Sequence, residues 1–376
     1  MKTAYHTAIR LLIFAACLAV PAAGMADVLY VSDWGNGTPG SGSIKKIFPD
    51  GTVTTFVSGL TGGPEGIAFD SHGNLFIALQ RPAVIDKVTP DGTLTTFASY
   101  NTSASGVAVD LLSGLAIDSS DNLYVSQAFP SEIDKITPSG IRSVFFTPGS
   151  PNADPFGLVF GANGDLYSSF MNGSAVVQIT PAGEGSPVMF ISNPTGLAFD
   201  SHGNLFITRL TGGIWKVDSE NNMHYFTDSM GEEGLATDRS GNLYAADYQQ
   251  TTITKITADG THSQFASGFT TPSFIASINP LGDFNRDGQF NAKDIGAMIA
   301  ALANQNDYLT AHNLTNEDLL SIGDINGDGK FNNADLQALI NLLQSGGGST
   351  NSVPEPSTLV LAVLAALMVG LFRRVS

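Results

Sequence analysis

The chain of 376 residues contains one cysteine and half as many basic residues as acidic ones. Cys17 lies in an apolar leader that we expect to be removed, so the mature protein has no disulfide. Lys and Arg total 17 against 34 Asp and Glu, and the net charge of −17 argues against nucleic-acid binding through a basic patch. The six histidines form no Ser-His-Asp order, and the mature chain offers no cysteine nucleophile. The sequence therefore predicts no catalytic residues.

Residues 1–26 have the features of a signal peptide. Lys2 and Arg10 make the start positive, "LLIFAACLAV" is a short apolar run, and "GMA" is a small-x-small cleavage pattern before Asp27. A lipoprotein signal at "FAAC" is the alternative interpretation. Either interpretation predicts export.

The other end of the chain combines a flexible linker (346–353) with an apolar segment (354–376). The apolar run ends at Arg373 and Arg374 and spans about 24 Å as a helix, somewhat short of the ~30 Å hydrocarbon core. The two arginines make up part of that difference by snorkelling on the cytoplasmic side. We therefore expect a C-terminal transmembrane helix.

The string "VPEPS", an apolar run and Arg-Arg resemble the PEP-CTERM sorting signal of Gram-negative bacteria. The resemblance implies a transient anchor in the inner membrane that is recognised by an exosortase-type enzyme. Processing near Pro354–Pro356 would release the protein or attach it to extracellular polysaccharide. The implied location is the cell surface or the extracellular matrix.

Internal repetition dominates residues 27–279. Segments such as "GIAFDSHGNLFIA", "GLAIDSSDNLYVS" and "GLATDRSGNLYAA" each read as a strand, a turn rich in Asp, Gly and Asn, and a second strand. Two further strands follow, joined by "PDG" or "ADG" turns. The Leu-aromatic markers lie 38 to 48 residues apart, the period of four-stranded propeller blades, at Leu29, Leu75, Leu123, Leu166, Leu205 and Leu243.

The first copy lacks its leading strand, and "TPSFIASI" (271–278) supplies a matching strand at the far end. We predict a mainly β, six-bladed propeller closed by strands from both ends of the segment, which leaves no open sheet edge at the seam. The segment resembles NHL-repeat propellers and, more loosely, the gluconolactonase and virginiamycin B lyase group.

The residue before each inner strand is expected to ring the mouth of the central channel. The ring is Glu65, Ser113, Phe156, Thr195, Glu233 and Ser273. With the loops that open on the same face, it gives these ligand-binding candidates: Glu65, Glu233, Asp33, Trp34 and Asp247. Their carboxylates could hold a divalent ion, as in propeller lactonases, although the Glu–Asn–Asp pattern of that family is not reproduced. The alternative is that a channel mouth is polar because it is wet.

Two stretches, "DFNRDGQFNAKD" and "DINGDGKFNNAD", repeat the spacing of a calcium loop, with oxygen ligands at positions 1, 3, 5, 7, 9 and 12 and Gly at 6. Each is followed by a helical apolar stripe. We expect two Ca²⁺ ions. The predicted ligands are Asp283, Asn285, Asp287, Gln289, Asn291 and Asp294 in the first loop, and Asp324, Asn326, Asp328, Lys330, Asn332 and Asp335 in the second, with Gln289 and Lys330 contributing carbonyl oxygens.

Asp at position 12 and the absence of an entering helix distinguish residues 281–345 from a calcium sensor. The duplicated loop–helix unit resembles the type I dockerin. That resemblance implies a small helical domain that folds on calcium and binds a cohesin-like partner. A purely structural spacer is the alternative.

Together these features suggest an exported surface or matrix protein. Its propeller would bind a carbohydrate or protein, and its dockerin-like module would dock to a cohesin-type partner. The alternative is a propeller enzyme, a lactonase or a polysaccharide lyase or hydrolase, recruited to a polysaccharide-processing assembly.

Overall fold

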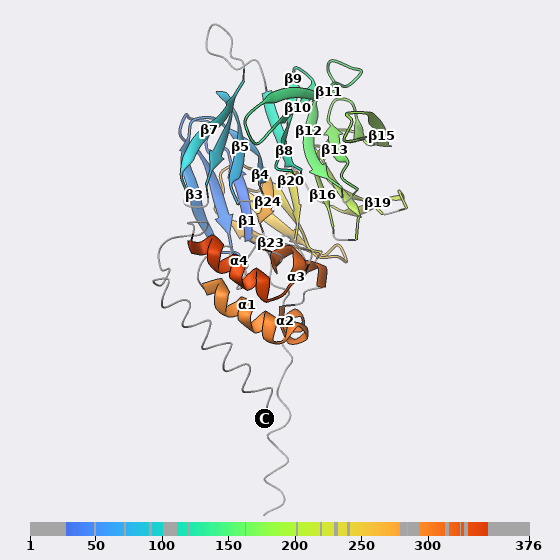
Figure 1. Cartoon of the computed structure of the whole chain (residues 1–376). Helices are drawn as coiled ribbons and strands as arrows, with labels where there is room; N and C mark the ends of the chain where they lie inside the picture. Colours follow the sequence, from blue (N-terminus) through green and yellow to red (C-terminus); the bar gives the residue numbers. More distant parts are fainter. Residues whose placement is uncertain are drawn as a thin grey trace, which may run out of the picture.

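The architecture is described from a computed structural model of the chain (Figure 1). It describes residues 28–344 except 49, 71–72, 90–91, 101–110, 119, 162, 201, 219, 229–231, 239–240, 279–283, 285–292, 313–315, 324 and 327–329. The predicted signal peptide, linker and sorting segment lie outside the described residues.

Within the described residues, twenty-four strands form six four-stranded antiparallel sheets, the blades of a propeller. Blade 1 contains β24 (Pro272–Ile278), β1 (Val28–Asp33), β2 (Gly42–Ile47) and β3 (Val53–Leu60). Blade 2 contains β4 (Pro64–Phe69), β5 (Leu75–Gln80), β6 (Ala83–Val88) and β7 (Leu94–Ser99). Blade 3 contains β8 (Leu111–Ile117), β9 (Leu123–Phe129), β10 (Glu132–Ile136) and β11 (Arg142–Phe146).

The remaining blades follow in the same order along the chain. Blade 4 contains β12 (Pro155–Phe160), β13 (Leu166–Phe170), β14 (Ala175–Ile179) and β15 (Gly185–Phe190). Blade 5 contains β16 (Pro194–Phe199), β17 (Leu205–Arg209), β18 (Ile214–Val217) and β19 (Met223–Thr227). Blade 6 contains β20 (Glu232–Thr237), β21 (Leu243–Asp247), β22 (Thr252–Ile256) and β23 (His262–Ser267). The predicted six-bladed propeller is confirmed.

The ring is closed by pairing between the two ends of the repeat region. Strand β24 pairs with β1, with Val28 opposite Ile278 and Asp33 opposite Pro272. The strand missing from the first sequence repeat is therefore supplied by residues from the last, as the sequence predicts. Since hydrogen bonds join the first and last segments, the ring opens only if this pairing breaks.

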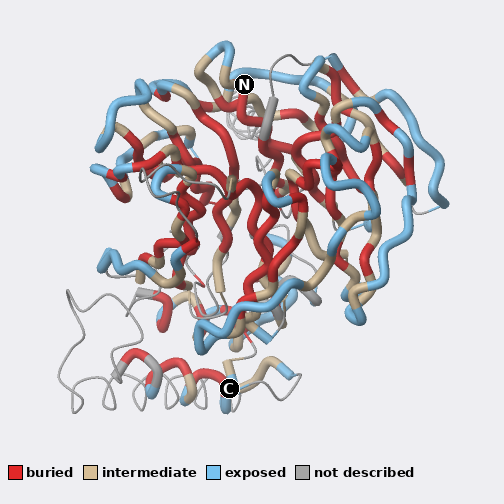
Figure 2. Tube along the Cα trace, turned by 90° about the horizontal axis from the view of Figure 1, so that it is seen from above, coloured by how far each residue is buried: buried red, intermediate tan, exposed pale blue. Residues whose placement is uncertain are grey.

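Local sequence explains how each blade forms. The turn glycines Gly92 and Gly260 have φ of +86° and +85°, which L residues rarely adopt. Each donates its N–H to a carbonyl three residues earlier, at 2.8 Å. Alternating apolar side chains pack between adjacent blades, and Figure 2 shows buried residues in the inner strands with exposed ones at the rim. Within the described residues this packing forms one apolar cluster at each interface between neighbouring blades.

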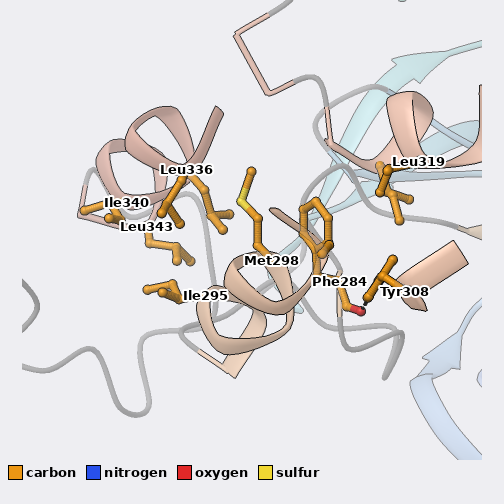
Figure 3. Close-up of a cluster of buried hydrophobic side chains, with 11 residues drawn as sticks. Phe284, Ile295, Met298, Tyr308, Leu319, Leu336, Ile340 and Leu343 are labelled. Carbon is orange, nitrogen blue, oxygen red and sulfur yellow. Dashed lines mark hydrogen bonds between the residues drawn. The ribbon is translucent and has the colours of Figure 1, made fainter. Parts of the chain in front are cut away.

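In the part of the chain after the propeller that the structure describes, there are four helices: α1 (Lys293–Ala303), α2 (Gln305–His312), α3 (Asn316–Gly323) and α4 (Asn333–Gln344). The predicted stripes are buried, with Met298 of α1 and Leu336 of α4 in one core (Figure 3). Helix α2 was not predicted, because its sequence carries no amphipathic stripe. It is fixed mainly by Tyr308, whose hydroxyl donates to the Phe284 carbonyl at 2.7 Å.

No helix within the described residues combines the length and apolar character that a membrane crossing requires. The segment predicted to be a transmembrane helix, residues 354–376, is not among them.

Candidate functional site

The channel-mouth residues lie inside the inner strands, as their second or third residue, rather than before them as the sequence suggested. A register shift falls at this position in all six inner strands, for example between Pro64 and Ile67 in β4. Such a bulge turns a side chain away from the regular alternation. It therefore explains why the ring residue and the following glycine depart from the simple strand pattern.

Close packing surrounds the channel. A Cβ added at Gly234 would lie 2.5 Å from the Ser273 carbonyl oxygen and 2.6 Å from the Phe274 Cα. Equivalent clashes meet a Cβ at Gly66 and Gly114. Glycine at this position lets the backbones of neighbouring inner strands approach each other.

Glu65 is buried and bridges two blades. Its carboxylate accepts a hydrogen bond from Ser273 Oγ at 2.9 Å and one from Gln80 Nε2 at 3.0 Å. The side chain of Glu233, its counterpart in blade 6, lies outside the described residues.

The other ring-face carboxylates hold turns. Asp33 accepts backbone hydrogen bonds from Gly35, Thr270 and Thr271, the last at 2.8 Å. Asp247 accepts from Gln249 and Gln250 at 2.9 and 2.8 Å. The half-buried indole of Trp34 packs on Gly63, where an added Cβ would lie 2.6 Å from the ring. Among the described residues no three His, Cys, Asp or Glu side chains converge on a metal position.

A set of buried hydroxyls lines the blades behind the ring, and the sequence analysis missed it. Ser126 Oγ accepts from Gly114 N at 2.8 Å and donates to the Phe156 carbonyl of the next blade at 2.6 Å. Hydroxyls occupy this position in four blades: Ser32, Ser126, Ser169 and Thr208. The signal was the fourth residue of each Leu-aromatic repeat, which is Ser or Thr in these four blades and Ala in the others.

A buried ionisable cluster lies in blade 3. Burial raises the pKa of Asp134 to about 6, although Arg142 Nε is 3.7 Å from its carboxylate. Gln127 Nε2 donates to the same carboxylate at 2.9 Å. The guanidinium of Arg142 lies 4.4 Å from the Tyr100 ring centroid, and burial raises the pKa of that tyrosine well above its ordinary value.

The two predicted calcium loops are only partly described. Asp294 and Asp335, the position-12 residues, are wholly buried in the first turns of α1 and α4. Asp335 accepts backbone hydrogen bonds from Asn326 at 3.3 Å and Asn332 at 2.8 Å. Of the other predicted ligands, Lys330 is also described. Those outside the described residues are Asp283, Asn285, Asp287, Gln289, Asn291, Asp324 and Asp328.

The described part of the second loop fits a hard cation. Asp335 and the amides of Asn326 and Asn332 supply oxygen donors of the kind that Ca²⁺ prefers. The hydrogen bond from Asn326 N to Asp335 brings positions 3 and 12 of the loop together. Beneath them, Phe284 and Phe331 stack with ring centroids 5.4 Å apart. The two loops therefore share one apolar base.

Comparison with known proteins agrees with the division of the chain into a propeller and a small helical domain. Residues 281–344 match the Dockerin type I domain family. None of the curated proteins compared with the sequence matches it. The chain thus contains a β-propeller and a type I dockerin domain.

Several solved structures resemble the propeller. A nidogen/laminin complex aligns with a TM-score of 0.57 and 16% identity, covering 66% of this chain and 97% of that one. A protein of unknown function from Bacteroides caccae gives 0.52 and 16%, covering 68% and 100%. A gluconolactonase from Xanthomonas campestris gives 0.50 and 16%, covering 56% and 78%. At these identities the likeness shows the fold alone.

Proposed function

We propose that this chain is an exported, non-catalytic binding protein. Its dockerin domain, folded by two Ca²⁺ ions, attaches it to a cohesin-type partner, and its propeller presents a surface to a carbohydrate or protein ligand. The buried pair Asp294 and Asp335 carries the proposal. These two residues end the two repeated loops, at the position where a calcium loop places its last carboxylate ligand, and both side chains are buried at the start of a helix.

Calcium would be held by the twelve oxygen ligands predicted from the two loops, and it would neutralise their negative charge. The chain itself supplies the frame. Asp335 ties the loop to the first turn of α4, and Phe284 and Phe331 anchor both loops on the shared core. Without the ions, the clustered carboxylates would repel one another, so folding and metal binding are coupled.

The path of the chain separates the dockerin link from the channel mouth. Val28 and Ile278 pair at the end of blade 1 from which the chain continues to the dockerin. Asp33 and Pro272 pair at the opposite end, where the channel-mouth residues lie. The dockerin link therefore leaves from the face opposite the channel mouth.

Export and sorting remain proposals from the sequence. Residues 1–26 would direct export, and the PEP-CTERM-like segment 354–376 would anchor the chain in the inner membrane before an exosortase-type enzyme transfers it to the surface or matrix. At that location the protein would be attached to, or surrounded by, extracellular polysaccharide.

The enzyme alternative receives less support. Asp33 and Asp247 are committed to backbone amides, and Glu65 is bridged to Ser273 and Gln80. Carboxylates engaged in this way stabilise turns and blade contacts. Of the ring-face candidates with a described side chain, Trp34 keeps a partly exposed surface for a ligand.

The test is binding of the full chain to a panel of purified type I cohesin domains, measured by calorimetry. We expect binding in Ca²⁺ that disappears in EGTA and returns on addition of calcium. Absence of binding to every cohesin, or binding that persists in EGTA, would overturn the proposal.

A further inference from the structure

One aromatic side chain differs from its counterparts in the other blades. The residue after the marker leucine is aromatic in all six blades: Tyr30, Phe76, Tyr124, Tyr167, Phe206 and Tyr244. Five of these are buried, whereas Tyr167 in blade 4 is only partly buried. The difference points to something missing around Tyr167.

In the other five blades, two side chains cover the aromatic ring. A lysine on the third strand pairs with it and lies 5.1–5.7 Å from the ring centroid. A phenylalanine at the bulge of the fourth strand packs edge-on at 4.9–5.1 Å. The lysines are Lys46, Lys87, Lys135, Lys216 and Lys255, and the phenylalanines are Phe56, Phe97, Phe145, Phe226 and Phe265.

Blade 4 replaces both covering groups with smaller or uncharged ones. Gln178 pairs with Tyr167 where the other blades have lysine. The residue at the bulge of the fourth strand is Val188, which is 37% exposed. In this blade a shorter, uncharged side chain therefore replaces the lysine, and a smaller one replaces the phenylalanine.

The turn before Tyr167 is also altered. Gly161 stands where four other blades have Asp. Its N–H donates to the Asp165 carbonyl at 3.0 Å, the same backbone hydrogen bond that the Asp makes in those blades. In blades 3 and 6 that Asp accepts the tyrosine hydroxyl, from Tyr124 at 3.1 Å and Tyr244 at 3.0 Å. Gly161 offers Tyr167 no carboxylate. Asp165 takes the place of the usual Asn and accepts from Gln178 Nε2 at 2.6 Å.

Two pockets share Gly161 in their lining, and the larger one lies beside the altered ring of blade 4. One, of about 510 Å³, lies between blades 4 and 5 and includes Tyr167, Gln178 and Val188. The other, of about 450 Å³, lies between blades 3 and 4 and includes Tyr124. Each is large enough for a small ligand or one unit of a chain. Losing packed side chains around one ring lowers stability unless another group fills the space.

The chemistry of the larger pocket is specific. It joins the aromatic rings of Tyr167 and Phe199 to polar groups that include Gln178, Asp200 and Asp218. Both carboxylates also accept backbone hydrogen bonds within their own turns, from Asn204 N and Asn222 N at 2.8 Å, so a sugar hydroxyl would use their remaining lone pairs. An aromatic face is electron-rich and attracts the C–H face of a sugar ring, while the carboxylates and amides match its hydroxyls. The usual lysine is absent from this pocket, and its carboxylates repel anions. In the smaller pocket Lys135 is paired with Asp118, with Nζ 3.6 Å from the carboxylate.

We propose that the groove formed by these two pockets binds a neutral oligosaccharide, with a pyranose unit on Tyr167 and the chain crossing Gly161. The site rests on the proposed function, since it assigns the ligand class and position to the propeller. The groove lies at the turns that join the first and second strands of the blades, such as the turn from Gly161 to Asp165, at the other end of the strands from the channel mouth.

The test compares the full chain with variants in calorimetry and saturation-transfer NMR. The probes are cellohexaose, xylohexaose, mannohexaose and laminarihexaose, with hexagalacturonate as the anionic counterpart. We expect at least one neutral probe to bind and hexagalacturonate not to bind. Val188→Phe, which restores the side chain of the other blades, should weaken binding by about tenfold or more. The combined Asp165→Asn, Gln178→Lys and Val188→Phe variant should abolish it.

Two further variants keep the result interpretable. Tyr167→Ala removes the proposed platform and should lose binding even if the combined variant fails to fold. Lys255→Gln makes the blade 4 change in blade 6, away from the groove, and should leave binding unchanged. Cohesin binding, measured on the same samples, should be unaffected in all of them.

Failure of every neutral probe to bind would overturn the site, as would undiminished binding in Val188→Phe and Tyr167→Ala. Preference for hexagalacturonate would overturn the neutral ligand. If the unmodified chain binds sugar but no cohesin, the docking proposal alone is overturned.

Discussion

The Asp33 carboxylate accepts the backbone N–H of Thr271 at 2.8 Å, joining residues 238 positions apart. Thr270 donates to the same carboxylate at 3.1 Å. The contact lies where the first and last strands of the propeller meet. A residue predicted to face a ligand thus closes the ring.

Removing this closure should destabilise the whole propeller. We expect Asp33→Ala to lower the free energy of unfolding by about 1.5–3 kcal/mol, because charged acceptors of backbone amides make the stronger hydrogen bonds. Both tryptophans of the chain, Trp34 and Trp215, lie in the propeller, so their fluorescence in urea reports on it. Asn36→Ala, in the same exposed loop, is the control. Equal stability of Asp33→Ala and the unmodified chain would show that the closure does not depend on this carboxylate.

Asp134 should make propeller stability depend on pH. Its folded pKa, about 6, lies above the ordinary value of 3.8, so the folded chain binds the proton more tightly than the unfolded chain. The stabilisation is present at low pH and is lost as pH rises from about 4 through 6. It amounts to about 1–3 kcal/mol, with Arg142 opposing and Glu132 reinforcing the shift.

The measurement is urea unfolding followed by tryptophan fluorescence between pH 4.5 and 7.5. Asp134→Asn should flatten the profile relative to the unmodified chain, because the amide does not titrate. Parallel profiles for the two proteins would contradict the assignment.

Close packing at the channel predicts that a larger residue at Gly234 will destabilise the propeller. Gly234→Ala should cost about 1–3 kcal/mol, since its Cβ would meet the Ser273 carbonyl and force the inner strands apart. Gly149→Ala is the matched control, because its Cβ meets nothing within 4 Å. Thermal unfolding of the two variants side by side gives the comparison. A Gly234→Ala midpoint no lower than that of Gly149→Ala would refute tight contact here.

Calcium stoichiometry should depend on Asp335. Asp335→Ala removes the carboxylate that links Asn326 and Asn332 to α4, so we expect one bound Ca²⁺ per chain in place of two. Gln337→Ala, exposed on the same helix, should retain two. Metal analysis after dialysis counts the ions, and two in both variants would remove Asp335 from the ligand set.

The architecture followed from the sequence because it repeats. The Leu-aromatic spacing marked the blades, and "TPSFIASI" identified the closing strand that pairs with β1. The roles of Asp33 and Asp247 did not follow, since their partners are backbone amides whose position depends on the folded turns. Helix α2 was missed because a single buried residue, Tyr308, holds it.

The substitutions around Tyr167 are visible in the sequence, but the groove that they line is not. Aligning the repeats places Gly161 against Asp, Gln178 against Lys and Val188 against Phe. Each substitution alone looks like ordinary variation between repeats. Their convergence on one ring requires strand register, which the structure provides.

The most direct test of the docking module is hydrogen exchange of the full chain in Ca²⁺ and in EGTA. Because Asp294 and Asp335 are buried at the ends of the calcium loops, we predict that chelation removes protection from α1 and α4 while the propeller strands keep theirs. Unchanged protection of α1 and α4 in EGTA would contradict a calcium-folded dockerin domain.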